Sequence, residues 1–410
     1  MSVDAAALQA EIDELAQISS APAPAVTRVL FSDEDQKARR WLCEKFEAAG
    51  LIVRCDAVGN IFARWEGSEP KLPAVATGSH IDAIPNAGKY DGVVGVLGGL
   101  EAVRSLKRAG FAPRRGIEII MFTAEEPTRF GLGCLGSRLM AGALSADKVA
   151  ALRDAEGRSL DELRAAADCA GSVDSVRLAS DCYEAFVELH IEQGPILERE
   201  GVDIGAVEKI AAPAAFRIRI TGEGGHAGAV LMPVRRDAGL AAAEIALAVE
   251  RAALASGSPD TVGTTGVFRI EPGAINSVPA RALIEIDLRD TNLETRGRAE
   301  AEIRAAVEHI AAKRRVEIEF EVINSDPPAI CAPGIVDAVC AAAAAHGWSC
   351  SRMVSRAYHD SLFMARVCPT AMIFIPCRNG WSHRPDEFSS VEAIGKGVAV
   401  LADTLRSLAG

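Results

Sequence analysis

The sequence predicts an α/β protein in which a smaller α+β domain is inserted into a larger, discontinuous domain. Three observations support this prediction. The chain has 410 residues, which is more than the roughly 250–300 residues that one hydrophobic core supports. Apolar strands alternate with helical segments in the first and last thirds of the chain. The middle third has a different order of strands and helices.

The first third contains a β-α-β unit. Leu72–Thr77 and Ile117–Phe122 are apolar runs of strand length, and Val93–Arg108 between them has helical periodicity. Such a unit implies parallel strands in an α/β core. Ala185–Leu189 and Ala371–Ile375 are further strand candidates of the same kind. We therefore expect both ends of the chain to contribute strands to one sheet.

The middle third predicts an antiparallel sheet with two helices. Phe216–Ile220 alternates apolar and basic residues, as a half-exposed strand does. The other predicted elements are the strands Thr264–Ile270 and Ala282–Leu288 and the helices Ala238–Leu254 and Ala301–Lys313. Along the chain these elements follow the order strand, helix, strand, strand, helix, and with a final strand this order is typical of a compact α+β sandwich.

Prolines bracket the inserted segment. Pro213 precedes it, and the pair Pro327-Pro328 follows it. We therefore predict a discontinuous domain formed by residues 1–212 and 327–410, and an inserted domain formed by residues 213–326.

Composition excludes several classes of partner. The net charge of -12 provides no positive field for nucleic acid or an anionic membrane. No apolar run approaches the roughly 20 residues of a membrane-spanning helix. Residues 1–18 predict an amphipathic helix without the features of a signal peptide, and the ten cysteines contain no C-x-x-C pair. The expectation is a cytoplasmic protein with reduced thiols and a small-molecule partner.

Histidines and acids follow the predicted strands. His80, His190 and His383 come directly after a strand or a short loop later, and Asp91 and Glu126 occupy equivalent positions. In open α/β sheets, ligands bind beyond the carboxyl ends of the strands. Imidazoles combined with carboxylates suit zinc, manganese or cobalt. The sequence therefore predicts a metal site at this edge of the sheet.

Each of these positions also has an ordinary structural explanation. A histidine at a strand end is more often structural, Asp91 could be a helix N-cap, and Glu125-Glu126 could be a solvated acidic turn. Asp82 lies two residues after His80 and could orient its imidazole. Coincidence is a poor explanation for five such positions together. The neighbouring acids Glu125 and Glu126, which follow a predicted apolar strand, are what a metal ligand beside a general base would require.

The middle domain carries three polar candidates. His226 lies in the glycine-rich turn 222–228, which is no dinucleotide fingerprint, and it could donate to a developing oxyanion. Asn276 and Arg289 follow predicted strands, and the planar fork of arginine suits a carboxylate. A turn asparagine and a surface arginine are the ordinary alternatives. His309 and His346 receive no role.

Six sequence motifs together resemble one enzyme family. They are GSHIDAIPNAGKYDGVVGVLGGLEA, TAEEPTRFG with CLGSR, ELHIEQGPILE, GHAGAVLMPVRRDA, PGAINSVPA with IDLRD, and IFIPCRNGWSHRPDE. The chain resembles the dimetal amidohydrolases of ureido acids, within the aminoacylase/carboxypeptidase superfamily. This family includes allantoate amidohydrolase, N-carbamoyl-L-amino-acid hydrolase and ureidoglycolate amidohydrolase. The resemblance extends from about residue 31 to about residue 390.

The resemblance implies a dinuclear metal site. Asp91 would bridge two divalent ions, His80 and His190 would complete one site, and Glu126 and His383 would complete the other. Manganese is the favoured metal, although the ligand set would accept zinc equally well.

The resemblance also implies catalytic roles and an assembly. Glu125 would be the general base for an activated water, with Asp82 behind His80. The middle domain would act as a lid and as the interface of a homodimer. In that dimer, His226 would reach the active site of the partner subunit.

The implied substrate residues are found on both predicted domains. Asn276 and Arg289 would hold the substrate carboxylate, and Gln193, Tyr358 and His359 would line the pocket. Tyr358 lies where other members of the family have glycine, and its bulk and hydroxyl suit a substrate that carries a hydroxyl.

Within the family, the segment 355–365 and the motif EEPTRFG favour ureidoglycolate as the substrate, with glyoxylate, ammonia and carbon dioxide as products. Allantoate or an N-carbamoyl-L-amino acid is the alternative substrate. A non-catalytic binding protein on the same fold is a remoter alternative, against which the intact Glu125 argues.

Overall fold

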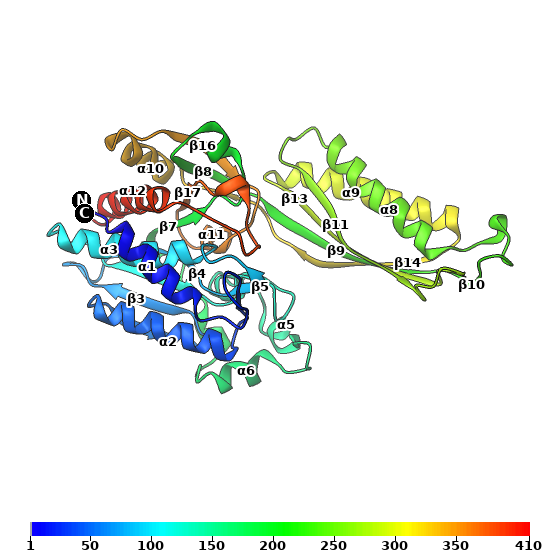
Figure 1. The fold of residues 1–410 in the computed structure, drawn as a ribbon, viewed down its shortest axis with the longest axis horizontal. Helices are drawn as coiled ribbons and strands as arrows, with labels where there is room; N and C mark the ends of the chain where they lie inside the picture. The colour runs from blue at the N-terminus through cyan, green and yellow to red at the C-terminus, as the bar shows by residue number, and fades with distance from the viewer. Residues whose placement is uncertain (1) are drawn as a thin grey trace. The chain divides into compact units, whose positions relative to one another are not determined.

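A computed structural model describes residues 2–410, which form two compact units (Figure 1). The first unit contains the chain up to Glu208, together with Ile330–Met353 and His359–Gly410. The second unit contains Lys209–Ala329 and Val354–Tyr358.

The short segment Val354–Tyr358, which the sequence boundaries assign to the first domain, belongs to the second unit. Its hydrogen bonds explain its place in the second unit. The backbone carbonyl of Ser355 accepts from the Ala211 N–H at 2.8 Å, and the Arg356 guanidinium donates to Asp260 at 2.6 Å.

The first unit contains a nine-stranded mixed sheet whose path is β15-β8-β17-β7-β4-β6-β3-β2, with β16 paired to β8. Its four central strands are parallel. They are β17 (Thr370–Ile375), β7 (Tyr183–Ile191), β4 (Ala74–His80) and β6 (Ile117–Phe122). Because β4 and β6 are parallel neighbours and α3 (Val93–Arg108) lies between them in the chain, the predicted β-α-β unit is confirmed.

Shorter strands complete the two edges. One edge is formed by β3 (Ile61–Trp65) and β2 (Ile52–Cys55), which continue antiparallel from β6. The other edge contains β8 (Ile204–Ile210), β15 (Ala329–Ile330) and β16 (Cys350–Ser355). A separate pair is formed by β1 (Val26–Arg28) and β5 (Ala83–Ala87).

One face of the sheet is covered by α3 and α12 (Val391–Ala409), which contact each other and strands β4 and β7. Next to them pack α1 (Ala5–Ala16) and α10 (Pro333–Ala345). Glycines let α3 approach closely, since a Cβ on Gly95 would lie 2.5 Å from the Leu189 carbonyl oxygen. This close packing places the start of α3 beside the ends of β4 and β7.

Other helices cover the opposite face. Side chains of β6 and β7, including Ile120 and Phe186, form a cluster with Leu135 and Met364 from α4 (Leu135–Met140) and α11 (Asp360–Met364). In contrast, Ile119, the neighbour of Ile120 in β6, and Thr77 of β4 lie near Gly99 of α3. Because successive side chains of a strand point to opposite faces, the sheet is covered on both sides, as in other α/β folds.

The remaining helices of the first unit are α2 (Asp33–Ala48), which packs on β2 and β3, and the short α5 (Ala146–Ala151), α6 (Leu160–Ala166) and α7 (Ile196–Glu200). None of the helices formed by residues 2–410 has the length and apolar character that crossing a bilayer requires.

The second unit is an antiparallel sheet with two helices, which confirms the predicted α+β class. Its strand order is β11-β13-β9-β14, formed by Val262–Glu271, Arg281–Asp290, Ala212–Thr221 and Glu317–Ser325. The helices α8 (Ala238–Ala255) and α9 (Leu293–Arg314) pack on this sheet. Phe216, Ile284, Ile245 and Ile303 form part of the core between them. A small hairpin is formed by β10 (Gly225–His226) and β12 (Ser277–Val278).

Burial predicts that Ile120 contributes more to the stability of the first unit than the exposed Ile52. We expect Ile120→Ala in β6 to lower the free energy of unfolding by about 2–5 kcal/mol, because it removes a fully buried side chain and leaves a cavity. Ile52→Ala in β2 is the matched control, since Ile52 is 62% exposed, and it should change the free energy by about 0.5 kcal/mol or less. Urea unfolding followed by circular dichroism measures both, and equal effects would contradict the packing described.

Candidate active site

The site lies at the carboxyl ends of the parallel strands. His80 is the last residue of β4 and pairs in register with Phe122, the last residue of β6. His190 pairs with Phe374 of β17 and is still inside β7. The prediction that His190 follows its strand was therefore wrong by two residues, because β7 continues through Ile191. The alignment of strand ends nevertheless brings the side chains together.

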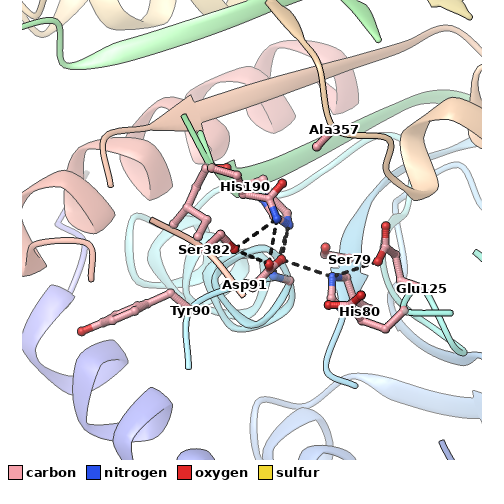
Figure 2. A network of polar contacts seen from close by, with 12 residues as sticks. Ser79, His80, Tyr90, Asp91, Glu125, His190, Ala357 and Ser382 are labelled. Atoms are coloured by element: carbon pink, nitrogen blue, oxygen red, sulfur yellow. Dashed lines mark hydrogen bonds and ion pairs between the residues drawn. The ribbon is translucent and has the colours of Figure 1, made fainter. Parts of the chain in front are cut away.

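Asp91 lies at the centre of the site (Figure 2). One carboxylate oxygen, Oδ1, is 3.1 Å from His190 Nε2 and 3.6 Å from His80 Nε2. The other, Oδ2, is 3.3 Å from His383 Nε2. Asp91 lies two residues before α3 begins at Val93, and the N-cap of that helix is Gly92, so the N-cap alternative for Asp91 is excluded. Each oxygen of Asp91 therefore faces a different set of histidines.

Two groups of ligand atoms share Asp91. The first contains His80, Asp91 and His190, the second contains Asp91, Glu126 and His383, and within each group the ligand atoms lie within 4.8 Å of one another. In the second group, Glu126 Oε1 is 3.4 Å from His383 Nε2. A third possible group joins His190 to Glu188 and His359. The first two groups contain the residues for which the family resemblance implies metal binding, and each could hold one ion.

Glu125 lies on the turn that follows β6. The preceding residue, Ala124, has a φ of 52°, which turns the chain sharply so that two adjacent carboxylates both reach the site. Glu125 Oε2 is 3.7 Å from His80 Nε2, and the Cys134 thiol donates to Glu125 Oε1 at 3.6 Å. Both carboxylates are buried, which excludes the solvated-turn alternative.

Asp82 holds two parts of the site: the turn that carries Glu125 and Glu126, and the imidazole of His80. Its two carboxylate oxygens accept the backbone N–H groups of Glu125, at 3.3 Å, and Glu126, at 3.1 Å. The His80 Nδ1 atom lies 3.0 Å from the Asp82 backbone carbonyl and 3.5 Å from its carboxylate. The imidazole is therefore held mainly by the carbonyl of Asp82, while the carboxylate fixes the turn that carries the two glutamates.

The carboxylates perturb one another because water is excluded. Burial first, then the charges of Glu126, Asp360 and Asp91, raise the pKa of Glu125 well above its ordinary value, although His80 opposes them. Burial and the charge of Asp91 raise the pKa of Glu126 to about 7. For Asp91, burial acts to raise the pKa, but the three neighbouring imidazoles outweigh it and hold the pKa well below its usual range.

The donor set fits two divalent cations. Asp82, Asp91, Glu125 and Glu126 are concentrated in a largely buried region, where isolated carboxylates are costly unless cations offset them. The Nε2 atoms of all three histidines point toward Asp91. Nitrogen and oxygen ligands in this combination suit zinc, manganese or cobalt.

Two predicted pocket residues adjoin these ligands. Gln193, with a φ of 54°, donates from Nε2 to Asp91 Oδ2 at 2.7 Å. The ring of His359, which directly precedes α11, lies 4.5 Å from that of His190, centroid to centroid. Both are therefore positioned around the candidate metal ligands of the first unit.

The second unit carries the other predicted site residues. Tyr358 lies within cation–π distance of Arg289, with the guanidinium carbon 5.5 Å from the ring centroid, and Arg289 forms a two-point ion pair with Asp287 at 2.7 and 3.0 Å. His226 is exposed on the β10 hairpin, where Gly228 N–H donates to its Nδ1 at 3.1 Å. The carbonyl of Asn276 accepts from the Ala227 N–H at 2.8 Å.

Sequence reasoning missed several polar residues of the site. Ser382 donates to Asp91 Oδ2 at 2.7 Å, and Glu387 accepts the Asp91 N–H at 3.0 Å. Glu188 is fully buried and accepts from Ser79 at 2.7 Å and from Ser361 at 2.6 Å. The one available signal was proximity in the chain, since Ser382 and Glu387 flank His383 and Glu188 lies two residues before His190.

The fold and site belong to a known class. The model of the peptidase family M20/M25/M40 matches residues 76–407, and the chain therefore belongs to this family of hydrolases. Two relatives are ureidoglycolate hydrolases. The protein from Arabidopsis thaliana is 54% identical over 100% of this chain and 87% of its own length. The rice protein is 55% identical over 98% of this chain and 84% of its own length.

A solved structure agrees with these relatives. The crystal structure of AtUAH in complex with glyoxylate superposes with a TM-score of 0.93 at 54% identity, covering 100% of this chain and 98% of that one.

The shared position of Asp91 generates a test of the metal site. We expect Asp91→Ala to lose both ions after dialysis against metal-free buffer, because each carboxylate oxygen faces a different ligand group. Glu126→Ala should lose mainly one ion, since Glu126 belongs to one group only. Atomic emission spectroscopy gives the metal-to-protein ratio, with Asp386→Ala as an exposed control on the His383 segment. Full occupancy in Asp91→Ala would exclude a shared ligand.

Proposed function

We propose that this hydrolase cleaves the ureido C–N bond of ureidoglycolate, giving glyoxylate, ammonia and carbon dioxide. One observation carries the hydrolytic chemistry: Asp91 is shared by two ligand groups, and Glu125 lies 3.7 Å from His80 of the first group and next to Glu126 of the second in the chain. The choice of substrate is supported by the similarity to ureidoglycolate hydrolases along the whole chain.

In the proposed mechanism, His80, Asp91 and His190 hold one divalent ion and Asp91, Glu126 and His383 hold the other. When bound, the two ions supply Lewis acidity that polarises the ureido carbonyl and acidifies a water molecule. Glu125 accepts the proton of that water as it attacks the carbonyl carbon. Glu125 then delivers the proton to the leaving nitrogen, which allows the C–N bond to break. The carbamate half decays to ammonia and carbon dioxide, and the hydroxyglycine half decays to glyoxylate and a second ammonia.

The substrate carboxylate is the group that Arg289 and Asn276 are proposed to bind. Arginine presents a planar fork that matches a carboxylate. The Asp287 ion pair and the Tyr358 ring fix the orientation of this guanidinium before substrate arrives. Tyr358 is proposed to contact the substrate hydroxyl, while Gln193 and His359 line the pocket beside the metal ligands.

A homodimer through the second unit is part of the proposal. Leu240, Leu247 and Leu254 are exposed at seven-residue spacing along α8, and β11, which α8 contacts, is an edge strand of its sheet. An apolar helix stripe beside an unpaired strand edge is typical of a protein interface. Across this interface His226 is proposed to stabilise the oxyanion in the partner's active site.

Manganese is the proposed metal and the cytoplasm the proposed compartment. The mixed imidazole and carboxylate ligands accept manganese as well as zinc. The ten cysteines are all free thiols, which is typical of a reducing compartment.

A comparison of substrates tests the proposed function. Manganese-loaded enzyme should release ammonia from ureidoglycolate with a kcat/KM at least tenfold above that for allantoate or N-carbamoyl-L-amino acids. Glu125→Gln should keep its metal and lose roughly three or more orders of magnitude in kcat, because one residue serves as both base and acid. A preference for allantoate or a carbamoyl amino acid would replace ureidoglycolate as the substrate. Metal binding without turnover of any ureido acid would favour the non-catalytic alternative.

Mixed dimers test the role of His226. The single variants His226→Ala and Glu125→Gln should each be nearly inactive. After dissociation and reassociation together, they should regain a substantial fraction of activity, because one site of each mixed dimer then has both native residues. Native mass spectrometry verifies that mixed dimers form. If they form without any gain in activity, His226 does not act across the interface.

A further inference from the structure

We propose that Glu387 is a positioning residue that fixes the orientation of Asp91 by joining the chain segment that carries Asp91 to the segment that carries His383. The inference rests on the proposed metal role of Asp91. Glu387 Oε1 accepts two backbone N–H groups, from Tyr90 at 2.8 Å and from Asp91 at 3.0 Å. The residues it joins are nearly 300 positions apart, and Glu387 itself is only 4% exposed.

A second connection runs through Ser382. Its Oγ atom lies 2.7 Å from Asp91 Oδ2 and 2.8 Å from Glu387 Oε2 (Figure 2 shows Ser382 beside Asp91). Glu387 therefore holds the main chain of Asp91 directly. The Ser382 hydroxyl lies between the two carboxylates and can donate its single proton to either one. Together these contacts restrain both the position of the Asp91 backbone and the rotation of its side chain.

The segment before Asp91 is shaped to receive Glu387. A Cβ on Gly88 would lie 2.4 Å from both the Cβ and the Oε1 atoms of Glu387, so a larger residue would displace this carboxylate. The two donors belong to Tyr90 and Asp91, which precede the N-cap Gly92 of α3, so their N–H groups have no partner within the helix. This is the environment of a structural carboxylate that is held on several sides.

The expected consequence concerns metal affinity more than the reaction itself. A shared ligand has to present one oxygen to each group, and a rotation about its side-chain bonds would favour one group over the other. Partners that orient metal ligands typically contribute a factor of 10–100 to affinity. The hydrogen bonds of Glu387 go to the Asp91 segment and to Ser382. Its loss should therefore act through Asp91.

Three variants test the proposal with Mn2+ alone as the probe. In calorimetric titration of metal-free enzyme, Glu387→Ala should bind Mn2+ about 10–100-fold more weakly. Glu387→Gln should restore affinity to within roughly threefold of the unmodified enzyme, because its amide oxygen can accept the two N–H groups and its NH2 can donate to Ser382. Asp386→Ala, on the exposed neighbouring residue, should bind as the unmodified enzyme does.

The outcomes separate positioning from other roles. If Glu387→Ala binds Mn2+ with the affinity of the unmodified enzyme, the proposal is wrong. It is also wrong if Glu387→Gln binds Mn2+ as weakly as Glu387→Ala, because the negative charge of Glu387, and not its hydrogen bonds, would then determine the affinity. If Glu387→Ala fails to fold by circular dichroism, Ser382→Ala decides: a severalfold weaker affinity supports the proposal, and an unchanged affinity overturns it. If the unmodified enzyme binds Mn2+ but does not hydrolyse ureidoglycolate, the proposed function is contradicted and the positioning role of Glu387 is not.

Discussion

Four carboxylates meet at the carboxyl edge of the parallel sheet, and their mutual repulsion is the constraint around which the site is built. Asp82, Asp91, Glu125 and Glu126 are each less than a tenth exposed. Removing such charges from water costs several kcal/mol per ion unless partners compensate. The protein provides imidazoles around Asp91 and backbone N–H groups around Asp82. Divalent cations are the natural remaining counter-charge.

Bringing these groups together requires unusual backbone at the loops that carry them. Ala124, Gln193 and His383 have φ values of 52°, 54° and 60°, in the left-handed region that residues other than glycine seldom adopt. Each such residue costs of order 1–3 kcal/mol and persists only where the surrounding structure determines it. All three adjoin or belong to the site. The rigid sheet and the closely packed α3 provide the stability that tolerates this local strain.

Local patterns explain why much of this architecture could be predicted from the sequence. The limits of α3 and β6 agree with the predicted ranges because apolar periodicity is a local property. The strand-end histidines were recognisable because parallel strands end at one edge. In contrast, the roles of Ser382 and Glu387 depend on a contact between segments nearly 300 residues apart, which no local pattern encodes. The transfer of Val354–Tyr358 to the second unit likewise depends on distant hydrogen bonds.

The same crowding that makes the site costly also suits its proposed base. A glutamate with an ordinary pKa near 4.3 is too weak a base to hold a proton between two steps. Burial and the neighbouring acids raise the pKa of Glu125 well above that value, which is the direction that the proposed role of proton carrier requires. The Cys134 thiol and His80 contact the Glu125 carboxylate and limit the directions in which it can turn. The unfavourable electrostatics of the cluster therefore support the proposed role of Glu125, because burial and the neighbouring acids both raise the pKa of this carboxyl.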